Sequence, residues 1–251
     1  MKKFNLIMFT LVSMFIFTLS VQAADVQKEQ EFVTAIENGE NIKVVSDFEV
    51  TENILLSKKI VLDLNNHTIT FTNQKYLKIV GGNLEITGTG TMVEKTPYYS
   101  PIILKGSVNK EDTNYSTLTV GENVTLKGWA GIFIDSVNGE NKIKDSYGVT
   151  VNVYGTLVGL NDTTGALGAG IYENGSISHV ENAPIINIYK SAKINATGDG
   201  IYAAGYGVWN IEGATIEGNT GIEIRAGILT INGATIIGNG IPVSASPNGS
   251  G

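Results

Sequence analysis

The fold is decided by Trp209-Asn-Ile-Glu-Gly-Ala-Thr-Ile-Glu-Gly-Asn219 and Leu229-Thr-Ile-Asn-Gly-Ala-Thr-Ile-Ile-Gly-Asn239, two near-copies of one pattern in immediate succession. A repeat of about twenty residues is too short for a pair of helices, but it suffices for three short strands with Gly and Asn at the corners. The pattern therefore predicts a solenoid of stacked coils. Trp209 is expected in the core because Leu229 takes its place one coil later, and Ile231→Asp is expected to unfold the terminal coils.

A second pattern, Gly-Ile followed by one more residue, measures the length of each coil. It starts at five successive glycines: Gly131, Gly170, Gly200, Gly221 and Gly240. The last two intervals between them match the bare repeat of about twenty residues, whereas the first two are longer. The longer intervals therefore indicate insertions.

These insertions fall at one corner of successive coils. They run from Gly106 to Tyr115, from Ser136 to Tyr147 and from Gly175 to Ala183, and each follows an apolar strand and precedes the next alternating strand. Because neighbouring coils lie about 4.8 Å apart, we expect the three loops to stack into a wall.

The region before the first coil predicts a short amphipathic helix. Phe32, Val33 and Ile36 lie at helical spacing, Gly39 provides the stop, and Asp25 stands at the expected N-cap. Such a helix would cover the hydrophobic cross-section of the first coil. We expect this capping helix within residues 24–40.

From Ile42 onward, apolar residues alternate with polar ones over short stretches separated by turn-forming clusters, which is typical of strands. No helical pattern lies between these strands, which disfavours α/β folds. We expect an all-β solenoid over residues 41–242 and a polar tail over residues 243–251. That tail contains no second amphipathic helix, so the last coil is expected to be uncapped and open to a partner, a further domain or self-association.

The first 23 residues resemble a secretory signal peptide. Lys2 and Lys3 precede an apolar block from Phe4 to Leu19, and a small-residue pattern leads to cleavage near Ala23. We therefore expect a secreted or surface-associated protein without membrane insertion after cleavage. Removing the two lysines leaves 15 basic against 24 acidic residues, a net charge of 15 − 24 = −9. This charge argues against nucleic-acid binding, and the absence of cysteine excludes disulfides and thiolate metal sites.

The chain resembles the pectin-lyase-like superfamily of right-handed parallel β-helices over nearly all of its expected mature length. The resemblance is carried by the short helix followed by Ile42-Lys-Val-Val-Ser-Asp-Phe-Glu-Val50 and Ile60-Val-Leu-Asp-Leu-Asn-Asn-His-Thr-Ile-Thr70. It implies a right-handed parallel β-helix from a bacterial exported protein. It does not imply one activity, because the superfamily includes polysaccharide lyases, glycoside hydrolases, adhesins and surface proteins without known catalysis.

The catalytic motifs of the family's enzymes are missing from this sequence. Asn-Thr-Asp, Asp-Asp, Gly-His-Gly and Arg-Ile-Lys do not occur, and the single arginine, Arg225, matches no family motif. We therefore expect a non-catalytic protein that binds a glycan or another partner. Two alternatives stay open, namely a polysaccharide lyase or glycoside hydrolase with an atypical site, and a piece of a larger surface adhesin.

Three aromatic residues of the Gly-Ile strands form the first candidate ligand-binding site. If Ile132 and Ile134 face the core, strand alternation directs the residue between them to solvent, and the stacked candidates are Phe133, Tyr172, Tyr202, Glu223 and Arg225. An aromatic ladder that ends in polar side chains suits contact with sugar rings. The alternatives are that the phase is inverted and the rings fill the core, or that the ladder only stabilises the sheet.

The inserted loops form the second candidate site through Asp145, Tyr147 and His179. Acids and a histidine that meet at one corner could bind Ca²⁺ or transfer protons, although no motif supports a calcium site. The alternative is a set of solvated polar loops. His67 is expected to be a corner residue in a polar turn.

Overall fold

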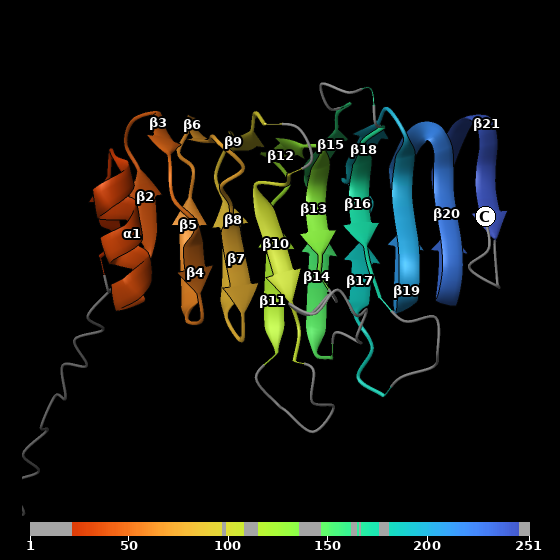
Figure 1. Ribbon diagram of the computed structural model, residues 1–251, viewed down its shortest axis with the longest axis horizontal. Helices are drawn as coiled ribbons and strands as arrows, with labels where there is room; N and C mark the ends of the chain where they lie inside the picture. Colours follow the sequence, from red (N-terminus) through yellow and green to blue (C-terminus); the bar gives the residue numbers. More distant parts are fainter. Residues whose placement is uncertain are drawn as a thin grey trace, which may run out of the picture.

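The computed structural model describes residues 22–96, 99–107, 115–135, 147–161, 165, 167–175 and 181–245. Over these residues the protein is a parallel β-helix with one α-helix, α1 (Glu29–Asn38), at its N-terminal end. Figure 1 shows the coils side by side along one axis, from α1 to β21. The predicted all-β solenoid is confirmed.

The strands stack into three faces, and every pairing between them is parallel. The first face contains β1 (Ala24–Val26), β2 (Ile42–Val44), β5 (Lys59–Asp63), β8 (Asn83–Thr87), β11 (Ser116–Val120), β14 (Val149–Val153) and β17 (Ile185–Ile188). The second contains β3 (Phe48–Val50), β6 (His67–Phe71), β9 (Gly90–Glu94), β12 (Val124–Gly128), β15 (Thr156–Gly159) and β18 (Lys193–Ala196). The third contains β4 (Ile54–Leu56), β7 (Leu77–Val80), β10 (Ile102–Lys105), β13 (Ala130–Ile134) and β16 (Ala169–Glu173).

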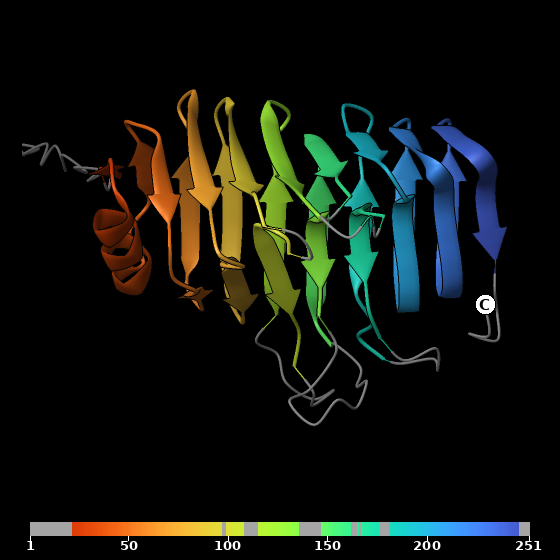
Figure 2. The ribbon, with the colours of Figure 1, turned by 45° about the horizontal axis from the view of Figure 1, so that its top comes forward.

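From Asp199 to Ala245 the strands are interrupted only between the first and second faces, at residues 213–214 and 233–234. Three long strands bend from one face to the next, namely β19 (Asp199–Glu212), β20 (Thr215–Asn232) and β21 (Thr235–Ala245), as Figure 2 shows at the blue end. Trp209 pairs with Leu229, as the repeat predicts.

The last Gly-Ile marker does not keep this register. Gly218 pairs with Gly238, but Thr220 pairs with Ile241, so β21 contains an extra residue between these two pairs. As a result, Ile222 pairs with Val243 rather than with Ile241. The assignment of Gly240 to the marker was therefore wrong, because a bulge separates it from the earlier glycines.

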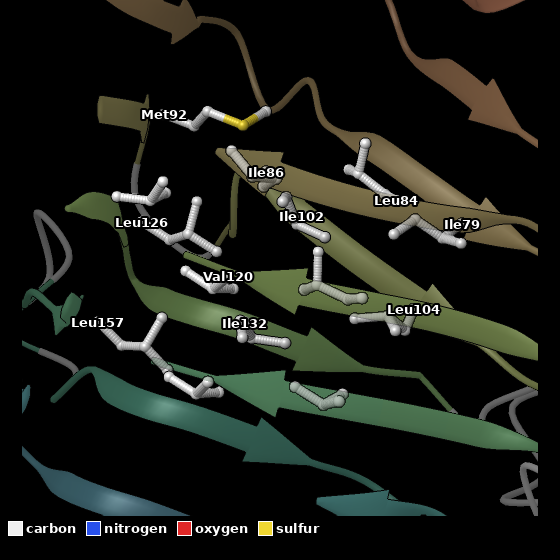
Figure 3. Packing of buried hydrophobic residues seen from close by; sticks show 14 of the residues in the cluster. Ile79, Leu84, Ile86, Met92, Ile102, Leu104, Val120, Leu126, Ile132 and Leu157 are labelled. Carbon is white, nitrogen blue, oxygen red and sulfur yellow. The ribbon is translucent and has the colours of Figure 1, made fainter. Parts of the chain in front are cut away.

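The core consists of inward-facing aliphatic columns that run along the axis (Figure 3). One column of the first face is formed by residues that pair from coil to coil: Ile42, Leu62, Ile86, Val120, Val153, Ile188, Ile211 and Ile231. Ile211 is 1 % exposed, whereas Ile231 in the last coil is 41 % exposed. Ile231 continues the column but is not fully buried, because no coil among the described residues covers it, and the effect of Ile231→Asp stays a prediction.

The glycines of the Gly-Ile markers allow the chain to turn tightly between the second and third faces. A Cβ atom on Gly170 would overlap the backbone oxygen of Gly200 in the next coil, and one on Gly200 would overlap the backbone oxygen of Gly221. Close backbone approach thus explains why this position is a glycine in successive coils.

The N-terminal helix starts later than predicted. Ala24–Val26 forms β1, which pairs with β2, so Asp25 lies in a strand and is not the N-cap. Lys28 precedes the helix and makes no side-chain capping bond. Gly39 ends the helix in the left-handed region with φ 76°, as expected.

Phe32 packs α1 against the first coil. Its side chain is buried, and its ring centroid lies 5.5 Å from that of Phe48. Among the described residues, no helix has the length and apolar character needed to cross a membrane.

Candidate functional site

The aromatic ladder predicted from the sequence exists on the third face. Phe133 pairs with Tyr172, and Tyr172 pairs with Tyr202. The ring centroids of these two pairs are 5.3 and 4.7 Å apart. The three rings are partly exposed, while Ile132 and Ile134 are buried. The prediction that these three rings face outward is therefore confirmed. We call Phe133, Tyr172 and Tyr202 the aromatic row.

A charged pair ends the aromatic row on its C-terminal side. Glu223 pairs with Tyr202 in the next coil, as predicted. Arg225 places its guanidinium 5.1 Å from the centroid of the Tyr202 ring and donates a 3.0 Å hydrogen bond from Nε to Glu223. A planar guanidinium over an aromatic face is a favourable cation–π arrangement, so the single arginine is held in one orientation beside the row.

A second ion pair borders the aromatic row on its N-terminal side. Ile103 pairs with Phe133, and Lys78 pairs with Ile103 one coil earlier. Lys78 Nζ lies 3.3 Å from an oxygen of Asp135. Both side chains are largely buried against the third face, so the row is bounded by charged groups at both ends.

Trp129 widens the aromatic surface. Its ring centroid lies 5.1 Å from that of Tyr172. A hollow of about 210 Å³ between Trp129 and Phe133 is also lined by Tyr99, Ser100 and Ile103. Neither the hydroxyl group of Ser100 nor the indole N–H of Trp129 has a hydrogen-bond partner among the described residues. The hollow therefore has aromatic walls, and two polar groups beside it make no hydrogen bond within the described part of the chain.

A larger hollow of about 540 Å³ lies on the other side of Trp129. It is lined by residues of the second face and its corners: Thr91, Val93, Glu94, Lys95, Thr96, Lys127, Gly128, Leu160 and Asn161. Its volume is within the range of small-molecule sites. Burial raises the pKa of Glu94, and the Thr96 hydroxyl and nearby backbone N–H groups oppose part of this rise. Sequence patterning did not reveal this hollow, because its walls come from different coils.

The tyrosines of the aromatic row are held in their neutral form. Burial raises the pKa of both Tyr172 and Tyr202. The neighbouring Tyr202 adds to the rise in the pKa of Tyr172, while the positive charge of Arg225 opposes part of the rise in both. Their hydroxyl groups therefore remain protonated at neutral pH and can donate hydrogen bonds. The row offers apolar ring faces together with uncharged donors, a combination suited to a polyhydroxylated ligand.

Directly behind the row, Glu173 follows Tyr172 and points into the core. It is 1 % exposed and accepts a 2.7 Å hydrogen bond from the backbone N–H of Gly205. Burial raises the pKa of Glu173 to about 7. Strand alternation carries a signal for this buried carboxyl group, because the phase that directs Tyr172 outward directs Glu173 inward, at the position that Ile134 takes one coil earlier.

The loop candidates lie largely outside the described residues. Asp145 and His179 lie in segments that the structure does not describe, so their proximity at one corner stays a prediction. Tyr147 is described and exchanges two backbone hydrogen bonds with Ser107, of 2.9 and 3.0 Å. Gly148 donates to Asn182 at 2.8 Å. The described ends of the three insertions thus lie together.

A metal site is not evident in the part of the chain that the structure describes. No three His, Asp or Glu side chains gather there closely enough to hold a metal ion.

His67 is the first residue of β6 and directly follows the predicted polar turn. Its Nδ1 shares a 3.1 Å hydrogen bond with a carboxylate oxygen of Asp47, which also accepts from the backbone N–H of Thr68. These bonds join two coils at a polar turn that contains Asn65 and Asn66, both with positive φ. The role of His67 is accounted for by this turn.

An asparagine ladder on the first face was missed at the sequence level. Asn187 donates to Asn152 at 2.9 Å, and Asn210 donates to Asn187 at 2.9 Å. The signal was present, because each asparagine lies between two inward apolar residues of its strand.

Comparison with protein-family models, with curated proteins and with solved structures returns no match to this chain.

Proposed function

We propose that this protein binds a carbohydrate polymer along the aromatic row and its extension at Trp129. Aromatic faces stack on the C–H faces of sugar rings, and neighbouring polar groups fix the orientation of the hydroxyls. The observation that carries the proposal is the unbroken ring contact from Trp129 and Phe133 through Tyr172 to Tyr202. Four rings from three successive coils thereby form one partly exposed surface.

The groups around this surface supply the polar part of such a site. Arg225 and Glu223 stand at one end of the row, and Lys78 and Asp135 stand at the other. A polymer that runs parallel to the solenoid axis would meet rings in the middle and charged groups at both ends. The hollow between Trp129 and Phe133 would accept a substituent or a terminal ring.

The same rings also stabilise one another, and binding measurements separate this role from recognition. We would screen soluble plant, host and cell-wall polysaccharides by affinity electrophoresis, and measure any binder by calorimetry with Tyr172→Ala and Tyr202→Ala. Removing one stacking ring should weaken binding by roughly tenfold or more. Release of reducing or unsaturated sugar is assayed in parallel, and turnover would favour the lyase or hydrolase alternative.

Tyr189→Ala is the matched control. Its ring stacks on Tyr154 with centroids 4.2 Å apart and planes at 1°, away from the aromatic row. The control should leave binding unchanged while removing a comparable stacked pair. Equal loss in Tyr172→Ala and Tyr189→Ala, or no binding to any polymer, would count against the proposal.

We further propose that the chain is an exported member of the pectin-lyase-like superfamily. The parallel β-helix, the N-terminal capping helix and the signal-like first 23 residues support this assignment. Mass spectrometry of the protein recovered from the medium of an expressing bacterium tests the export step. A mature chain that begins at or near Ala24 is the expected result.

A further inference from the structure

The hollow beside the aromatic row is a small site with an apolar floor and aromatic walls. Ile103 takes the outward position of β10 next to Phe133, yet it is only 7 % exposed, so it forms the floor. Phe133, Tyr99 and Trp129 stand around it as walls. The volume of about 210 Å³ is below the roughly 300–1,000 Å³ of sites that enclose a whole small molecule. The hollow therefore suits one side group of a larger ligand.

Neighbouring coils hold the walls of the hollow in place. The ring of Tyr99 stacks on that of Tyr76, with centroids 6.2 Å apart and planes at 4°. The backbone N–H of Trp129 donates to the carbonyl of Tyr99 at 2.9 Å, and the carbonyl of Trp129 accepts from the N–H of Ala169 at 2.9 Å. A site that is fixed before binding loses little conformational entropy when a ligand enters.

Two polar groups beside the hollow lack hydrogen-bond partners in the described part of the chain. Ser100 is 2 % exposed, and its hydroxyl group is one of them. The buried indole N–H of Trp129 is the other. Most buried polar groups in proteins are hydrogen-bonded, and leaving one unpaired is unfavourable. A ligand group that offers an acceptor to the indole and a partner to the hydroxyl would satisfy both.

The hollow has no charged lining. The residues that line it in the described part of the chain are all uncharged. The cations at the two ends of the aromatic row are already paired, since Lys78 lies 3.3 Å from Asp135 and Arg225 lies 3.0 Å from Glu223. A carboxylate or ammonium substituent would lose its hydration here without gaining an opposite charge. An uncharged substituent is therefore favoured.

We propose that this hollow receives the acetamido group of an N-acetylated amino sugar, an inference that rests on the carbohydrate binding proposed above. An acetamido group carries one carbonyl oxygen, one N–H and one methyl group. An indole N–H only donates, whereas a hydroxyl group both donates and accepts. Trp129 therefore donates to the carbonyl oxygen, and Ser100 accepts from the N–H. The methyl group packs on Ile103 and Phe133.

Other common substituents of sugars match the hollow less completely. A hydroxyl group supplies hydrogen bonds but leaves the apolar floor and walls without a contact. A methyl group fills apolar space but leaves both polar groups unpaired. An O-acetyl ester has the shape of an acetamido group but has no N–H to donate. Because Phe133 lines the hollow and also belongs to the aromatic row, a sugar ring stacked on Phe133 can direct its substituent into the hollow.

Calorimetry with three β-1,4-linked hexasaccharides tests the assignment, because they differ only at C2. They are the hexamers of N-acetylglucosamine, glucosamine and glucose, compared at high salt to screen the attraction between the amines and the acidic protein. The acetamido hexamer should bind about tenfold more tightly than the other two. In saturation-transfer NMR of methyl N-acetylglucosaminide, the acetyl methyl protons should receive more saturation than the ring protons. Methyl 2-O-acetylglucoside should be the weaker competitor of the two.

Ser100→Ala and Trp129→Phe test the two hydrogen bonds. Each should lower the ratio of acetamido to hydroxyl hexamer affinity by roughly two- to tenfold. Ser100→Ala should not lower Tm, because the hydroxyl group that it removes has no partner in the described part of the chain. Ser116→Ala is the matched control. Ser116 is also buried, but its hydroxyl group donates to the carbonyl of Lys105 at 2.6 Å, so this variant should lower Tm and keep the affinity ratio.

The outcomes separate this assignment from the proposed function. Equal affinity for the acetamido and hydroxyl hexamers, no binding of any hexamer, or an unchanged affinity ratio in both variants would overturn the acetamido assignment. Carbohydrate binding that shows no acetamido preference, yet is lost in Tyr172→Ala, would remove this assignment alone and leave the proposed function standing. Absence of all carbohydrate binding would remove both.

Discussion

The backbone N–H of Gly205 donates a 2.7 Å hydrogen bond to the carboxyl group of Glu173, which lies in an inward column between Ile134 and Ala203. This bond opposes the cost of burying the charge, but burial is the larger effect, so the pKa of Glu173 rises from 4.5 to about 7. The folded protein therefore holds a proton at Glu173 that the unfolded chain releases at lower pH.

This proton makes stability fall as pH rises. Below about pH 4.5 both states are protonated at Glu173, and its contribution is fully present; it is lost as pH rises through about 7. The loss amounts to about 3 kcal/mol, since each pKa unit corresponds to about 1.4 kcal/mol. Glu173→Gln should keep the bond from Gly205 and remove this dependence, so that the variant is the more stable protein at pH 8. Urea unfolding at several pH values measures the difference, and parallel curves for the two proteins would contradict it.

Two isoleucines in one column should respond differently to truncation. Ile188 is buried with coils on both sides, so Ile188→Ala should cost about 2–5 kcal/mol of unfolding free energy. Ile231→Ala should cost clearly less, because Ile231 is already 41 % exposed. Chemical denaturation at low protein concentration provides the comparison. Equal losses would mean that the last coil is covered in solution.

The asparagine ladder gives a third test, based on the number of bonds broken. Asn187 both donates to Asn152 and accepts from Asn210, whereas Asn210 makes one such bond. Asn187→Ala should therefore cost about 1–3 kcal/mol, and Asn210→Ala about half as much. Thermal unfolding followed by the circular dichroism of the strands reports both variants. A larger loss for Asn210→Ala would show that the ladder does not act through these bonds.

A double-mutant cycle on Tyr172 and Tyr202 measures how strongly the rings of the row support each other. Stacked aromatic pairs contribute about 0.5–1.5 kcal/mol beyond their buried area, and a coupling energy in that range is expected here. The Tyr154–Tyr189 pair, stacked more closely at another corner, provides the reference cycle. Coupling in the reference alone would indicate that the row is not held together by ring contact.

The repeat was sufficient to predict the architecture because a parallel solenoid places equivalent residues directly above each other. The pairing of Trp209 with Leu229 and the outward direction of Phe133 both follow from local alternation and period. The sequence was less informative at the first and the last of the described coils. Asp25 has the chemistry of a cap but pairs in β1, and Ile231 has a core neighbour on one side only.

The features that the sequence did not reveal depend on several coils at once. The surroundings of Glu173 are set by Ile134 and Ala203, which come from the two neighbouring coils. The contact of Trp129 with Tyr172 likewise joins residues of two coils. One sequence shows the position of each residue within its coil, but not which side chains a neighbouring coil brings against it.

The two nearly identical coils at the C-terminal end show how such a chain can change over evolutionary time. Because Trp209 and Leu229 lie in register, copying one such segment adds a coil that can pair with its parent in the same register. The aromatic row ends at Tyr202, before these copies begin. Duplication of such a segment would therefore lengthen the rod without changing the rings of the aromatic row.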